Sequence, residues 1–183
     1  QLRTDFAFGS PIGNGLNFHV GGFYRVGDGP RQTGFTSNNG GQIKANLTKN
    51  FSNGFARIYV KYLNDRTAAY MPMPVEVSGT NKSPKWGELN AYDAFRGSLH
   101  STQLLKDKTI GGDGNILSSD VADGMHSVSK SFGGEFNISP KSSWTLSNKF
   151  RLSSNGGQFI APFPANVGNA ASILGSIPSY KSA

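Results

Sequence analysis

The residues able to do acid–base, nucleophilic or metal chemistry are few and widely spaced. The 183-residue chain has no cysteine and only three histidines, His19, His100 and His126. That spacing lacks the short intervals by which histidines of one helix or loop share a metal ion. Serines are plentiful, but no Gly-x-Ser-x-Gly sequence would place one on a nucleophile elbow. We therefore expect no enzyme, no catalytic residue and no metal site.

Glycine-rich segments offer no better site for a cofactor. Residues 111–115 are followed by Asp120 and Asp123, but the segment lacks the ligand spacing and the final glutamate of an EF-hand loop. Residues 9–15 and 27–29 do not form the Gly-x-Gly-x-x-Gly pattern that joins a strand to a helix in dinucleotide-binding proteins. All three segments are more typical of turns, and we expect no cofactor.

Composition and charge narrow the class of partner. The chain carries 18 Lys and Arg against 11 Asp and Glu, for a net charge of +7. Because the basic residues are scattered along the sequence, no nucleic-acid partner is expected. The charge fits attraction to an anionic surface such as lipopolysaccharide, or to an anionic ligand. Hydrophobic residues make up 36% of the chain, too few for a large conventional core.

Apolar and polar residues alternate in several segments. The clearest is 16–26, and the same period of two recurs further along. Alternation predicts strands with one apolar and one polar face. Strands are expected at 4–8, 16–26, 42–48, 55–62, 131–138 and 144–152. The outward, apolar set is expected to be Phe18, Val20, Ile43, Leu47, Ile58, Val60, Phe136 and Leu152. The inward, polar set is expected to be Asn17, Lys44, Asn46, Arg57, Lys61 and Glu135.

The connections between these strands alternate in length. Tight turns are expected at 11–15, 52–54 and 140–143. Long loops are expected at about 27–39, 64–125 and 154–183. Outer-membrane barrels are built in this way, with short turns on the periplasmic rim and long loops outside the cell. Tyr24, Tyr62 and Trp144 lie near strand ends on the apolar face, where interfacial aromatic girdles belong. We predict an all-β fold, an antiparallel transmembrane β-barrel of the bacterial outer membrane, with about six of its strands in this chain.

The loop at 64–125 is the expected place of function, because connections of this length are usually functional or disordered. Its aromatic residues Tyr70, Trp86, Tyr92 and Phe95 are candidates for ligand binding, since such rings stack on sugars or chelate rings. Tyr92 and Phe95 could instead form a small core of the loop, whereas Tyr70 and Trp86 are expected to be more exposed. A weak helical pattern runs over 88–105.

Five segments together resemble a known family. Residues 18–25 (FHVGGFYR), 40–48 (GGQIKANLT), 59–66 (YVKYLNDR), 132–136 (FGGEF) and 159–164 (FIAPFP) are similar to the early barrel of TonB-dependent outer-membrane transporters of Gram-negative bacteria. The resemblance implies a barrel of about 22 strands around a plug. It also implies import of a scarce nutrient, such as an iron chelate, cobalamin or a glycan, with energy delivered through TonB.

This chain departs from the family pattern in having no plug and no TonB-box segment. The expected partners are therefore outer-membrane lipid and lipopolysaccharide, the remainder of the barrel and its plug, TonB through that plug, and a small-molecule or glycan ligand. The chain also opens without a signal peptide, so we expect either a removed leader or an internal fragment.

Two alternatives remain open. A passive outer-membrane porin fragment would share the alternation and the sorted loops, and a plug upstream would separate it from a transporter. A soluble β-rich adhesin or carbohydrate-binding module would fold in water without detergent.

Overall fold

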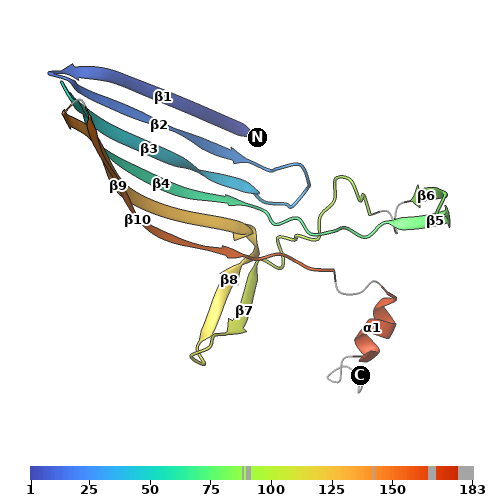
Figure 1. Ribbon diagram of the computed structural model, residues 1–183. Helices are drawn as coiled ribbons and strands as arrows, with labels where there is room; N and C mark the ends of the chain where they lie inside the picture. The colour runs from blue at the N-terminus through green and yellow to red at the C-terminus, as the bar shows by residue number, and fades with distance from the viewer. Residues whose placement is uncertain (88, 90–91, 142, 165–167, 177–183) are drawn as a thin grey trace.

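The computed structural model describes residues 1–87, 89, 92–141, 143–164 and 168–176. Six long strands form one antiparallel sheet in the order β1-β2-β3-β4-β9-β10 (Figure 1). Their bounds are β1 (Leu2–Gly13), β2 (Leu16–Gly27), β3 (Asn38–Phe51), β4 (Gly54–Thr67), β9 (Met125–Lys141) and β10 (Trp144–Phe159). The all-β, antiparallel prediction is confirmed. The sheet is open, with β1 and β10 as its two edges.

Several strands run further than the alternation predicts. β10 continues through Ser154 to Phe159, so the last connection begins at residue 160 rather than at 154. Its final residues stay paired with β9 as far as the partners Phe159 and Met125, although the segment between them is rich in Ser, Asn and Gly. Backbone pairing holds that part of the strand, together with side-chain hydrogen bonds from Ser129 to Asn155 and from Gln158 to Asp123. β4 likewise extends to Thr67, which shortens the long connection to residues 68–124.

Short and long connections lie at opposite ends of the sheet, as predicted. Figure 1 shows the three hairpin turns together at one end and the longer connections at the other. The first turn is Asn14-Gly15, with φ of 50° and 71°. Two successive positive φ values are typical of a type I′ turn, whose twist matches that of a strand pair. Residues 52–53 make the second turn, and Ser143 belongs to the turn between β9 and β10.

The long connection contains structure of its own. Two hairpins form within it, from β5 (Glu76–Thr80) with β6 (Ser83–Gly87) and from β7 (Lys106–Ile110) with β8 (Ile116–Asp120). Residues 111–115 close the second hairpin, as the glycine cluster predicts. A short η1 turn (Val121–Asp123) then leads into β9, and α1 (Ala170–Ser176) follows β10. No helix in the described part of the chain is long and apolar enough to cross a membrane.

The weak helix expected over 88–105 is wrong for the described residues of that segment. Residues 94–96 make a single turn instead. The cause is Asp93, whose Oδ1 accepts hydrogen bonds from the backbone nitrogens of Phe95 at 2.9 Å and Arg96 at 3.0 Å. An aspartate that bonds the backbone two and three residues ahead favours a turn over a continuing helix.

The strand register sorts residue types onto two opposite faces of the sheet. Across the six strands, two neighbouring rows define the apolar face. They are Phe8, Val20, Ala45, Val60, Phe132 and Leu152, and Ser10, Phe18, Leu47, Ile58, Gly134 and Phe150. The neighbouring residues along each strand point to the other, polar face. The two predicted sets therefore lie on opposite faces, one set on each, as expected.

Nothing among the described residues covers the apolar face. Figure 1 shows a single curved layer with no described helix or second sheet packed over it. The only buried hydrophobic residues in the described part of the chain are Ala68 and Ala69, which lie beyond the end of β4. Ile58 is 51% exposed and Val60 49% exposed, although they stand on a central strand. A sheet in water would bury these side chains against a second layer.

The polar face carries ion pairs that reach across strands. Arg25 on β2 holds Asp65 on β4 through two hydrogen bonds of 2.7 and 2.9 Å. The residue between them on β3 is Gly40, with a φ of 141°. A Cβ at that position would lie 2.3 Å from the carbonyl oxygen of Asn64, so only glycine fits. The bridge therefore depends on the glycine beneath it.

A second set of charges lies nearer the hairpin turns. Glu135 on β9 accepts from Arg57 on β4 at 3.1 Å and pairs with Lys149 on β10 at 3.0 Å. The Nε of Arg57 also donates to the hydroxyl of Thr48 on β3 at 2.8 Å. One side-chain row thus connects four neighbouring strands. Such pairing is weak at an exposed surface and stronger where water is scarce.

Candidate ligand-binding site

The connections at the loop end of the sheet hold one another in place. Arg31, between β2 and β3, donates through Nη1 to the carbonyl oxygens of Ala94 at 2.6 Å and Gly97 at 3.0 Å. The backbone nitrogen of Gln32 donates to the carbonyl oxygen of Arg96 at 2.7 Å. The connection of residues 28–37 therefore fixes part of the longer one, although the two are far apart in sequence.

A small packed cluster joins the two connections. Its buried members are Thr33, Ser37, Ala68, Ala69 and His100. The His100 ring meets the rings of Phe35 and Tyr70 edge-on, with centroid distances of 5.7 and 5.8 Å. The backbone nitrogen of Ala68 donates to the carbonyl oxygen of Ser37 at 2.8 Å. His100 thus lies at the centre of the contact between the loops.

The surroundings of His100 disfavour its charged form. Its Nδ1 lies 3.2 Å from the hydroxyl of Ser98, and its buried Nε2 has no hydrogen-bond partner among the described residues. Burial lowers the pKa of His100, because the charged ring would lose its hydration without gaining a counter-ion. The packing of the two connections therefore favours the uncharged ring.

Beside this cluster opens a recess that we call the loop cleft, lined by Arg31, Val75, Trp86, Gly87, Ala94 and Phe95. Its volume is about 610 Å³, within the range of small-molecule sites. Trp86 is 68% exposed and Phe95 is 83% exposed. The two carbonyl contacts fix the position of the Arg31 side chain. Two open aromatic rings beside a fixed guanidinium suit a flat or sugar ring that carries an anionic group.

The structure brings together two of the four candidate residues. Trp86 and Phe95 both line the loop cleft, whereas Tyr70 and Tyr92 do not. Tyr70 packs against His100, and the Tyr92 hydroxyl lies 2.9 Å from the sulfur of Met73. The expected exposure is confirmed for Trp86 and wrong for Tyr70, which is half-buried. Of the two residues that could instead have formed a small core, Tyr92 is half-buried and Phe95 is exposed. The turn at Asp93 explains Phe95, since it interrupts the helix that would have aligned this ring with its neighbours.

Arg31 is the cleft residue that the sequence pattern does not reveal. It stands beside Pro30 in the connection between β2 and β3, with no repeating pattern around it. Its position in the cleft depends on hydrogen bonds to the carbonyl groups of Ala94 and Gly97. These residues are more than 60 positions away in the sequence, so no local pattern predicts the contact.

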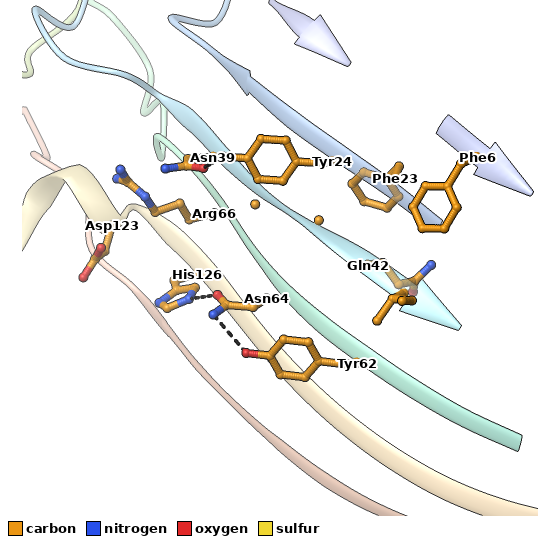
Figure 2. Close-up of a pocket in the computed structure, with 13 residues that line it drawn as sticks. Phe6, Phe23, Tyr24, Asn39, Gln42, Tyr62, Asn64, Arg66, Asp123 and His126 are labelled. Carbon is orange, nitrogen blue, oxygen red and sulfur yellow. Dashed lines mark hydrogen bonds between the residues drawn. The ribbon is translucent and has the colours of Figure 1, made fainter. Parts of the chain in front are cut away.

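A second hollow, the rim recess, lies on the apolar face near the loop end (Figure 2). Its volume is about 620 Å³, and Phe6, Tyr24, Ile43, Tyr62, Asn64, Arg66, Asp123 and His126 are among its lining residues. Figure 2 shows the Tyr62 hydroxyl accepting from Asn64, which in turn lies 2.7 Å from the His126 ring. The Tyr24 hydroxyl donates to Asn39 at 2.9 Å. Both tyrosines therefore present a ring to the apolar face and a hydrogen-bonded hydroxyl towards the loops.

The aromatic residues expected in the interfacial girdles lie at the two ends of the apolar face. Tyr24 and Tyr62 lie on the apolar face towards its loop end, and Trp144 begins β10 at the turn end, where it is 75% exposed. Amphipathic rings at the two ends of an apolar band are typical of a membrane interface.

Comparison with known proteins does not identify a family for this chain. The chain matches no protein-family model, and neither curated proteins nor solved structures give a match. Within the described ranges, no three His, Asp or Glu side chains lie close enough to hold a metal ion.

The contact between the two connections is predicted to weaken in acid. An exposed imidazole titrates near pH 6.5, and the packed ring titrates lower. The packing therefore keeps its full strength above about pH 6.5 and loses it progressively as the pH falls towards the lowered pKa. Hydrogen exchange at the amides of Gln32 and Ala68, corrected for intrinsic rates, should be faster at pH 5.5 than at pH 7.5. His100→Phe should abolish this difference, and equal protection of the unsubstituted protein at both pH values would contradict the prediction.

Proposed function

We propose that this chain is a segment of a bacterial outer-membrane β-barrel that serves as a nutrient receptor of the TonB-dependent type. The observation that carries the proposal is the uncovered apolar face, which stands opposite a charged face on the same single-layered sheet. Lipid would cover such a face favourably, because leaving a large apolar side chain in water rather than in an apolar medium costs about 1.5–3 kcal/mol of free energy.

The position of the ionisable groups supports the same assignment. The two central rows of the apolar face contain no charged side chain. Charged residues at the middle of the lipid face of a barrel would cost about 2–4 kcal/mol each. The ion pairs around Asp65 and Glu135 stand on the other face, where a barrel has its water- or plug-filled interior. The free edges of β1 and β10 would then pair with the remaining strands of the barrel.

The loops favour a receptor over a passive porin. Two connections hold each other through Arg31, and the cluster around His100 packs them together. A braced loop that presents a cleft with Trp86 and Phe95 is suited to binding, whereas a porin needs only an open mouth. The ligand that fits is a ring compound with an anionic group, such as a carboxylate-bearing iron chelate or an acidic glycan. The plug and TonB would supply the transport step.

A soluble adhesin is the second candidate, and dependence on detergent separates the two. We expect this chain, expressed alone, to sediment as aggregate in plain buffer and to stay dispersed in a mild non-ionic detergent. The apolar face and the unpaired edge strands are the reason. A monodisperse monomer that unfolds cooperatively in buffer without detergent would contradict the membrane assignment and favour the adhesin.

The loop cleft is tested by truncating its rings in the full-length protein. Trp86→Ala combined with Phe95→Ala should lower affinity about tenfold or more, because both rings would lie against the ligand. Calorimetry with ferric citrate, cobalamin and an acidic oligosaccharide identifies which probe binds. Phe163→Ala is the matched control, since Phe163 is 69% exposed but does not line the cleft. Equal affinity of the double variant and the control for the bound probe would remove the cleft from ligand recognition.

A further inference from the structure

The basic residues of the apolar face stand only at its two ends. On the turn side are Lys49 and Lys141, the register partner of Trp144, and on the loop side are Arg66, His126 and Lys130. No Asp or Glu belongs to this face in the six described strands. The Lys49 ammonium already donates to the carbonyl oxygen of Asn14. Positive charge therefore flanks the uncharged rows on both sides, and Lys130 stands in the row immediately beyond them on the loop side.

Two of these loop-side residues, Arg66 and His126, line the rim recess, and Lys130 borders it beside Tyr62. Arg66 and His126 are direct cross-strand partners, and so are Tyr62 and Lys130. The Lys130 ammonium stands 6.0 Å from the centre of the Tyr62 ring, which forms part of the wall. Arg66 is steadied by donating to the carbonyl oxygen of Ala122. The recess thus has basic groups at its loop end.

Apolar side chains line the part of the recess nearest the uncharged rows, and Asn39, Gln42 and Asn64 are also among its lining residues. Phe6, Ile43 and the ring of Tyr62 line it and share the row next to the uncharged rows. Figure 2 shows Phe6 and Tyr62 in this lining. An anion with no hydrocarbon would leave these side chains without a partner. An amphiphile would satisfy both ends at once, with its chain along the apolar wall and its charge beside the basic groups.

We propose that the rim recess binds a phosphate-bearing lipid from the membrane leaflet on the loop side. Its phosphate lies among Arg66, His126 and Lys130, and an acyl chain runs along Phe6 and Ile43. This inference rests on the proposed membrane function and adds a specific lipid site to it. One carboxylate, Asp123, also lines the recess and accepts from Gln158 at 2.7 Å. Its negative charge opposes the phosphate, so its removal should strengthen binding.

The test uses the full-length protein in a neutral detergent, with lipid binding measured by native mass spectrometry. The probes are dioleoyl phosphatidic acid, dioleoyl phosphatidylcholine and glycerol 3-phosphate. Phosphatidic acid should bind about tenfold more tightly than phosphatidylcholine, and glycerol 3-phosphate should not compete. Lys130→Gln and His126→Gln should each weaken phosphatidic acid binding by up to about fivefold, the effect of one basic residue near a lipid surface. Asp123→Asn should strengthen it.

Lys49→Gln is the matched control, because it removes one positive charge from the other end of the same face. Equal weakening by Lys49→Gln and Lys130→Gln would reduce the effect to general charge attraction and overturn the site. Equal binding of the two lipids would overturn it as well, and competition by glycerol 3-phosphate would assign the recess to a soluble phosphate compound. In each of these cases the protein still depends on detergent, so the membrane assignment survives. A protein that is monodisperse without detergent would overturn both proposals.

Discussion

An apolar face without a cover is the constraint on which the rest of this structure depends. The sheet has a single layer, and its central strands expose Ile58 and Val60 by about half. A soluble protein removes such a surface by packing a second layer on it, and the described chain has none. Under the proposed membrane assignment, the sheet would be stabilised by the surrounding lipid and by strands that pair with β1 and β10. Residue types, loop lengths and charge positions are all consistent with this assignment.

On the polar face of the same strands, many of the charged side chains are paired across strands. Arg25 reaches Asp65 across an intervening strand because Gly40 leaves the space free. Arg57 and Lys149 converge on Glu135 from opposite sides. Other basic groups, such as the directly opposed Lys44 and Lys61, have no acidic partner in the described part of the chain. Like charges in direct register repel, so this part of the face suits an interior that holds water or an acidic partner.

Much of the sheet could be predicted from local chemistry. Alternation identified both faces, and Asn-Gly or Pro-containing segments identified the turns. The extension of β10 could not be predicted in this way, because the Ser-Asn-Gly segment before Phe159 has no alternation and is held by backbone pairing. The loop cleft was predicted only in part. Aromatic content pointed to Trp86 and Phe95, but the contribution of Arg31 depends on two carbonyl groups that are distant in sequence.

The most direct measurement of the central claim uses the absence of cysteine from these 183 residues, with any cysteine elsewhere in the full-length protein replaced by serine. Single cysteines at 58, 59, 60 and 61 of the full-length protein would carry an environment-sensitive fluorophore, in bilayers that contain a nitroxide-labelled lipid. Residues 58 and 60 lie on the apolar face, and 59 and 61 lie on the polar face. We predict strong quenching and blue-shifted emission at 58 and 60, with neither at 59 and 61. Equal quenching at all four positions, or none at 58 and 60, would contradict a lipid-facing sheet.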